Sequence, residues 1–179
     1  MKDLKKIINL TIWVIISFLL LSQAESEAQV IKMSAKDLTE RSTAVLYGKC
    51  SKVKSEWNDK KDIILTQVTV VPEEYIKGNM GSEAVITVPG GRVGDILYEV
   101  SEMPFFVEGE EVVVFIRTNN AGKNLITGGY QGKMKIEIDK KTGQRMVHDT
   151  GTEIQTPGQI RKAEKLEDFV VKLKGWAKN

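Results

Sequence analysis

The sequence predicts a mainly β domain, a small barrel or sandwich with a helix near each end. Short segments in which apolar and polar residues alternate recur roughly every 8–12 residues, and glycine-rich turns separate them. Of the 179 residues, 41% are hydrophobic and 28% are charged, a balance that excludes a disordered chain. The chain contains no internal repeat, so we expect one domain of ordinary size.

Residues 1–28 predict a secretory signal peptide. Three lysines precede an apolar stretch, residues 7–21, which is shorter than the roughly 18–20 residues that span a bilayer as a helix. Small-x-small patterns then predict cleavage after Ala24 or Ala28. We therefore expect an extracytoplasmic protein, periplasmic or secreted, with residues 29–179 as a single domain and no stable membrane insertion after cleavage. An uncleaved N-terminal anchor is the alternative.

The first predicted elements are a short helix and two strands. Residues 34–42 predict the helix, with Ser34 as its cap. Residues 44–53 and 63–71 alternate as strands, and Pro72 is expected at a bulge or a sheet edge. The side chains on one face of the second strand are Ile64, Thr66, Val68 and Val70. Further strands are predicted at 84–88, 96–100, 112–117, 125–127, 133–139 and 145–148, of which 112–117 is the most hydrophobic and is expected at the centre.

The C-terminal part predicts an amphipathic helix at residues 157–175. Thr156 is suited to the cap and Pro157 to the first helical position. Apolar residues then recur at three- and four-residue intervals from Ile160 to Leu173. The polar side mixes acidic and basic residues, which favours packing against the domain over binding to a membrane surface.

Segments 43–49, 65–70, 76–78, 85–91 and 109–115 follow one another in an order that resembles a group of small secreted bacterial proteins. The same order is distantly similar to the netrin-like (tissue inhibitor of metalloproteinases-like) OB-fold module. There, an opening strand, a "T-x-V-x-V" strand and a Lys-Gly turn succeed one another. The resemblance covers about residues 43–117. It implies a small OB-like (netrin-like) barrel, with the short N-terminal helix and the C-terminal helix packed outside.

The resemblance does not carry the inhibitory residues over. Inhibitors of that family begin with a cysteine whose amino group binds the protease zinc, and disulfides hold them together. This chain has a single cysteine, Cys50. The resemblance therefore implies the fold but does not imply a metalloproteinase-inhibiting mechanism.

The composition also excludes several chemistries. The only histidine is His148, so no His-pair metal motif exists, and neither a metal site nor a cofactor is predicted. An enzyme would have to use Cys50 or His148, and a buried, inert thiol is the simpler expectation for Cys50. A net charge of +2 is too balanced for a dedicated nucleic-acid binder. We predict no catalytic residues.

Candidate partner-binding residues lie in or beside loops. They are Trp57, Arg92, Phe105, Phe106 and Tyr130. Aromatic side chains at loop ends can anchor a protein partner, and the planar guanidinium of Arg92, in a glycine-rich loop, can bind a carboxylate. Packing within the domain is the competing interpretation for each of them.

These observations together predict a non-enzymatic, extracytoplasmic module that binds a protein partner, such as a secreted peptidase. Two alternatives stay open at this point. One is a carbohydrate- or oligonucleotide-binding OB face. The other is an uncharacterised enzyme that uses Cys50 or His148.

Overall fold

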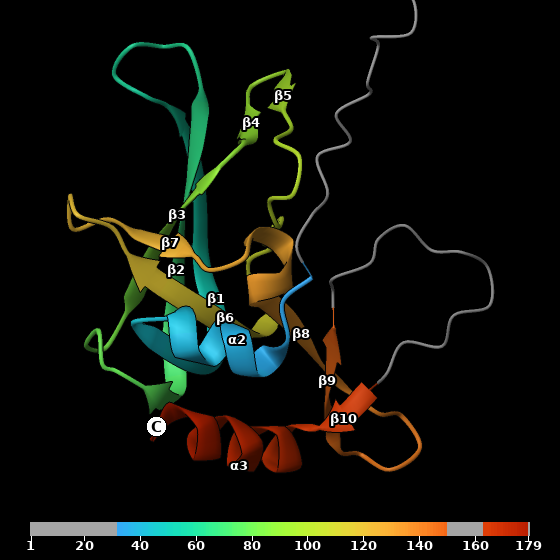
Figure 1. The fold of residues 1–179 in the computed structure, drawn as a ribbon. Coiled ribbons are helices and arrows are strands. Elements are labelled where there is room, and N and C mark those ends of the chain that lie inside the picture. Colours follow the sequence, from blue (N-terminus) through green and yellow to red (C-terminus); the bar gives the residue numbers. More distant parts are fainter. Residues whose placement is uncertain (1–31, 150–162, 179) are drawn as a thin grey trace, which may run out of the picture. The chain divides into compact units, whose positions relative to one another are not determined.

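The computed structural model describes residues 32–149 and 163–178, which form a mainly β fold with a curled half-barrel sheet and two α-helices (Figure 1). The predicted fold class is thereby confirmed. The predicted signal peptide, residues 1–28, lies outside the described residues. Among residues 32–149 and 163–178, no helix has the length and apolar character needed to cross a bilayer.

One α-helix begins the described part of the chain, the strands follow it, and a second α-helix ends it. The helices are α2 (Ala35–Arg41), the 3-10 helix η1 (Gly129–Gly132) and α3 (Leu166–Ala177). The strands are β1 (Ala44–Trp57), β2 (Ile64–Lys77), β3 (Ala84–Pro89), β4 (Gly91–Val93), β5 (Ile96–Tyr98), β6 (Glu111–Thr118), β7 (Asn124–Ile126), β8 (Lys133–Ile138), β9 (Arg145–Asp149) and β10 (Ala163–Lys165).

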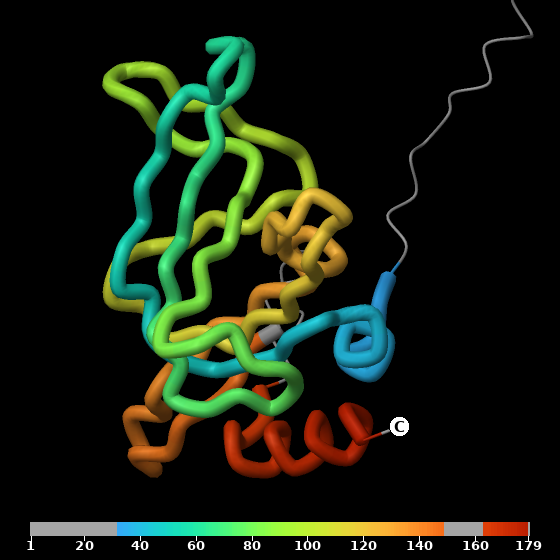
Figure 2. Tube along the Cα trace, turned by 90° about the vertical axis from the view of Figure 1, so that its left-hand side faces the viewer, coloured from blue at the N-terminus to red at the C-terminus, as the bar shows by residue number. Residues whose placement is uncertain are grey.

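The main sheet is antiparallel, with the strand order β10-β9-β8-β6-β1-β2-β3, and β7 pairs with β6 beside this path. Strands β4 and β5 form a separate hairpin. β1 and β2 have 14 residues each, so their hairpin projects past the neighbouring strands, beside the β4–β5 hairpin (Figures 1 and 2).

A bulge bends this long hairpin at Gly48. The register between β1 and β2 shifts between Tyr47 and Gly48, and Pro72 lies opposite Gly48. A Cβ atom at Gly48 would collide with the carbonyl oxygen of Val71, so only glycine allows the two backbones to approach so closely. Pro72 lies at this bulge, as predicted.

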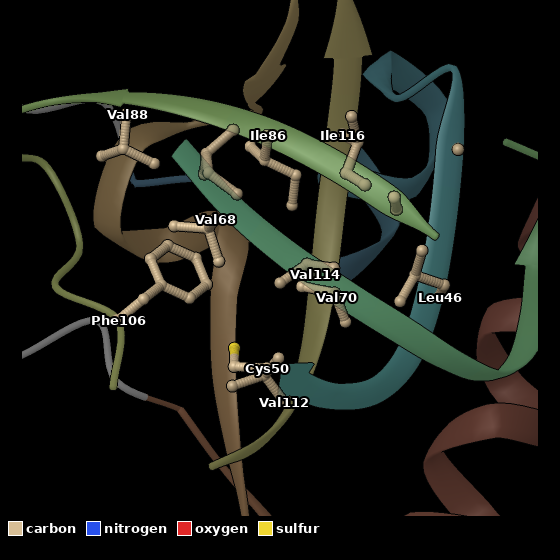
Figure 3. Packing of buried hydrophobic residues seen from close by; sticks show 13 residues of the cluster. Leu46, Cys50, Val68, Val70, Ile86, Val88, Phe106, Val112, Val114 and Ile116 are labelled. Atoms are coloured by element: carbon tan, nitrogen blue, oxygen red, sulfur yellow. The ribbon is translucent and has the colours of Figure 1, made fainter. Parts of the chain in front are cut away.

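Buried apolar side chains form two clusters, one on each face of the sheet. The interior cluster fills the curl of the barrel (Figure 3) and contains Ala44, Leu46, Cys50, Val68, Val70, Ala84, Ile86, Val88, Phe106, Val112, Val114, Ile116 and Ile126. The outer cluster packs the sheet against α2 and α3 and contains Leu38, Val45, Ile76, Val113, Phe115, Met134, Ile136, Val147, Leu166, Phe169, Val170 and Leu173. The two helices therefore lie outside the barrel.

Strand β6 contributes to both clusters. Val112, Val114 and Ile116 face the interior cluster, whereas Val113 and Phe115 face the helices. All five are fully buried, which explains why this strand reads as a continuous apolar run. Its predicted central position is confirmed. β2 alternates instead over residues 64–71, where the four residues expected on its buried face are buried; further along the strand, Ile76 is buried in the outer cluster.

The curl of the sheet is not closed by a hydrogen-bonded ladder. β3 and β7 lie next to each other, and the Nδ2 of Asn124 donates to the carbonyl oxygen of Val85 at 3.1 Å. β3 pairs with β2 alone among the described strands. We call this junction between β3 and β7 the seam.

The C-terminal helix is shorter than predicted. The prediction of helix at residues 157–175 is wrong for residues 163–165, which form β10 and pair with β9, and α3 begins only at Leu166. The free edge of β9 offers backbone hydrogen bonds that the apolar periodicity of the segment does not reveal. Thr156 and Pro157 lie outside the described residues. The predicted strand at 96–100 ends at Tyr98, and its partner β4 was not predicted.

Candidate functional site

A cleft of about 270 Å³ lies where the β1–β2 hairpin, the β4–β5 hairpin and residues 103–106 meet. Figures 1 and 2 show the two hairpins rising side by side from the same end of the sheet. The cleft wall is mostly apolar. Its main apolar side chains are Val88, Leu97, Val100, Met103, Phe105 and Phe106.

Two hydroxyl groups and a glycine form the polar part of the cleft. Thr66 Oγ1 donates to the carbonyl oxygen of Gly90 at 2.5 Å, and Ser55 Oγ lies 2.8 Å from Thr66 Oγ1. Gly91 packs directly onto both hydroxyls, so that a Cβ atom at this position would collide with them. Its φ of +136° is also one that glycine alone adopts readily. The β4–β5 hairpin can therefore approach β1 and β2 only through this glycine.

A buried ion pair holds residues 105–107 in place. The Nζ of Lys133 lies 2.7 Å from Glu110 Oε1, and each of the two side chains is only 9% exposed. Lys133 also donates to the carbonyl oxygen of Phe105 and lies 4.7 Å from the centre of the Phe106 ring. Glu110 Oε1 accepts the N–H of Val107 at 2.8 Å. The wall of the cleft is thus tied to β8 by one lysine and one carboxylate.

Exposed apolar side chains surround the mouth of the cleft. Leu97 is 45% exposed and Phe105 is 54% exposed, although both line the cavity. Arg92 lies at the same mouth, cross-strand from Leu97. Within the part of the chain that the structure describes, its guanidinium has no hydrogen bond or ion pair. The cleft thus combines apolar walls with one uncompensated positive charge.

Three of the five predicted partner-binding residues meet here. Arg92, Phe105 and Phe106 line the cleft, but Phe106 is 9% exposed and serves mainly as a wall, since it belongs to the interior cluster. Trp57 is half-buried at the end of β1, opposite Ile64, and does not line the cleft. Tyr130 is half-buried in η1, where its N–H donates to the carbonyl oxygen of Glu102 at 2.8 Å.

Sequence reasoning missed Ser55, Thr66 and Leu97. They lie on three different strands, and only the pairing of β1 with β2 and the fold of the β4–β5 hairpin bring them together. The available signal was the Gly90-Gly91 pair. Two adjacent glycines after a strand indicate a close approach of backbone to neighbouring atoms.

Cys50 and His148 do not form a catalytic pair. Cys50 lies on β1 and His148 on β9, with β6 and β8 between them, a separation on the order of 14 Å along the sheet. Burial and the nearby Glu110 carboxylate raise the pKa of the Cys50 thiol to about 12, so the thiol stays protonated and unreactive. The Nε2 of His148 lies 3.6 Å from Glu137. In the described ranges, no group of three potential metal ligands occurs.

A second pocket, of about 580 Å³, is larger, but its arginine is already ion-paired. Arg145 lines it and binds Glu73 through two hydrogen bonds of 2.8 and 2.9 Å, and it also lies 2.9 Å from Glu111. The hydrogen bonds from Arg145 lower the pKa of Glu73. Because Glu73 and Glu111 already pair with the guanidinium of Arg145, this group offers less to an anionic ligand than Arg92 does.

The outer face of the β1–β2–β3 sheet carries Lys49, Lys52 and Lys54, and also exposes Val71 and Val85. Lys54 is paired with Glu56 at 2.6 Å. Residues 49–54, 67–71 and 84–88 contain no aromatic side chain. These segments of the face therefore lack the rings on which bases or sugars stack.

Comparison with known proteins adds no family to this description. No protein-family model matches the chain, and no curated protein matches it significantly. The geometry of the cleft is accordingly the basis for assigning a function.

Proposed function

We propose that the protein is a non-enzymatic, extracytoplasmic binding module that holds an apolar segment of a protein partner in the cleft. The observation that carries the proposal is the exposure of Leu97 and Phe105 around a concave apolar wall. Single exposed apolar residues are ordinary on a protein surface, whereas a group of them around a cavity is typical of a binding site.

The architecture of the site supports binding by a preformed surface. The Lys133–Glu110 ion pair fixes residues 105–107, and the hydrogen bonds of Thr66 and Gly90 fix the hairpin on the other side. A wall that is already ordered loses little conformational entropy when a partner binds. The export predicted from residues 1–28 would place this surface outside the cytoplasm, where a secreted peptidase is one partner class that the sequence resemblance suggests.

The test is a selection, against the purified protein, of linear peptides displayed on phage in two libraries, one fused to the coat protein through the peptide C-terminus and one with a free peptide C-terminus. We expect the selected peptides to be rich in apolar residues and to lose at least tenfold in affinity against Phe105→Ser. The matched control is Val171→Ser, because Val171 is 69% exposed on α3 and is not among the residues that line the cleft. Peptides that bind both variants equally, or no enrichment at all, would contradict the proposed site.

A further inference from the structure

The cleft offers a ligand one unpaired cation and no anion. Arg92 is exposed and lies at the mouth of the cavity, and it is the only charged residue among the described residues that line it. Within the described residues it has neither an ion pair nor a hydrogen bond. Arg145 provides the contrast, since its guanidinium is held by Glu73 and Glu111. A guanidinium beside apolar walls attracts a ligand that carries a carboxylate next to an apolar group.

The hydroxyl groups in the cleft can accept hydrogen bonds but cannot donate them. The single proton of Thr66 Oγ1 is given to the carbonyl oxygen of Gly90. The hydrogen bond between Ser55 and Thr66 must therefore use the proton of Ser55. Ser55 Oγ keeps only lone pairs for a ligand, so it can accept an N–H group, whereas a carboxylate is repelled from this end and directed to Arg92.

The size of the cleft restricts the occupant further. The cleft volume of about 270 Å³ lies just below the roughly 300–1,000 Å³ of pockets that hold drug-sized ligands. A single amino-acid residue with a free carboxylate belongs to this size class.

We propose that the cleft binds the C-terminal residue of a partner chain, an inference that rests on the proposed function and names its ligand. The apolar side chain of that residue lies between Leu97 and Phe105. Its terminal carboxylate binds Arg92, and its main-chain N–H is directed to Ser55. A chain end places a carboxylate, an N–H and an apolar side chain on one residue, which matches the three kinds of surface that the cleft presents.

The experiment uses acetylated tetrapeptides, Gly-Gly-Gly-X with X as Leu, Phe, Val or Ala, each made as the free acid and as the amide. Binding to the purified protein is measured by calorimetry. We expect the apolar free acids to bind at least tenfold more tightly than the matching amides, with Ala the weakest. Arg92→Gln should abolish the difference between acid and amide. Arg117→Gln is the control, because it removes the same charge from the exposed end of β6.

A third kind of peptide, acetyl-Gly-Gly-Leu-Asp amide, carries its carboxylate on a side chain and has no free C-terminus. If it binds as tightly as the free acids, the cleft recognises an acidic side chain and the C-terminal proposal is overturned. If acids and amides bind equally well, or if only the display-selected internal sequences bind in a manner that depends on Phe105, the C-terminal proposal fails and the proposed function stands. If no peptide of either kind binds, both fail.

Discussion

Residues 44–46 of β1 and 112–116 of β6 are buried on both faces, whereas residues 51–57 at the other end of β1 are half-buried or exposed. The first set, the covered region, lies between the interior cluster and the helices. The second set projects past the main sheet, pairs with residues 64–69 of β2 and faces the β4–β5 hairpin and residues 103–106. Together these segments form the open region. One strand therefore passes from a fully packed environment into one with a cavity beside it.

The difference shows how the cleft arises from the fold. Where a second layer covers the sheet, the apolar side chains of both faces are buried against other side chains and leave no surface for a ligand. In the open region the inward positions carry small or hydroxylic residues, Ser55 and Thr66, which neighbour Gly91 and leave space beyond it. The binding surface is thus the part of the sheet that its own helices do not reach.

The largest expected effect is a difference in stability between alanine variants of two phenylalanines, Phe115 and Phe105. Phe115→Ala in the covered region should lower the free energy of unfolding by about 4 kcal/mol, because a fully buried ring is replaced by a void. Phe105→Ala in the open region should change it by less than about 0.5 kcal/mol, since exposed positions contribute little to stability. Urea denaturation followed by circular dichroism measures both. A loss above about 2 kcal/mol for Phe105→Ala would show that this side chain is a core residue.

The next effect concerns the ion pair that joins the two regions. Glu110→Ala should lower the free energy of unfolding by about 3 kcal/mol, because Lys133 then remains buried without its carboxylate. The comparison is Glu56→Ala in the exposed Lys54–Glu56 pair, for which we expect less than about 1 kcal/mol. Equal losses in the two variants, measured by urea denaturation, would contradict the structural role of the buried pair.

A smaller effect tests how closely the β4–β5 hairpin approaches the sheet. Gly91→Ala should cost about 2 kcal/mol, because its Cβ meets the hydroxyls of Ser55 and Thr66 at a positive φ. Gly94→Ala also has a positive φ but meets open space, so we expect about 1 kcal/mol. Thermal denaturation measures the free energy of unfolding of both variants. The difference between the two losses gives the contribution of the contact between Gly91 and the sheet. Binding of apolar peptides should weaken only in Gly91→Ala.

The smallest effect is a pH dependence at Cys50. The folded thiol has a pKa of about 12, while an unfolded thiol ionises near pH 8.5. Between these values the unfolded state holds fewer protons, so the stability contributed by Cys50 falls as the pH rises, by at most about 1.4 kcal/mol per pH unit. The advantage of the native protein over Cys50→Ala in urea denaturation should therefore shrink between pH 8.5 and 10.5. A constant difference over that range would contradict the buried, neutral thiol.

Periodicity in the sequence predicted the elements that are governed by local pattern. The capped helix at Ser34, the alternation in β2 and the central position of 112–116 all follow from side-chain spacing and are confirmed. The end of the chain was harder to predict. Residues 163–165 pair with β9 because an edge strand is available there, and only the tertiary fold creates that edge.

The candidate site could be predicted only in part. Arg92 and Phe105 were identified because an arginine among glycines and an aromatic pair in a loop stand out in the sequence. No local sequence pattern distinguishes Ser55, Thr66 and Leu97, because only the pairing of distant strands brings them together. The same pairing leaves Trp57 and Tyr130 outside the cleft.

The seam between β3 and β7 gives the barrel a line along which it can open. Parting these strands breaks a side-chain hydrogen bond between Asn124 and Val85, whereas parting β1 from β6 breaks a continuous ladder. Amide hydrogens on the seam side of β3 should therefore exchange with solvent through local opening, and those of β6 only through global unfolding. Since residues 88–91 at the end of β3 also line the cleft, we expect any opening of the seam to widen the binding surface as well.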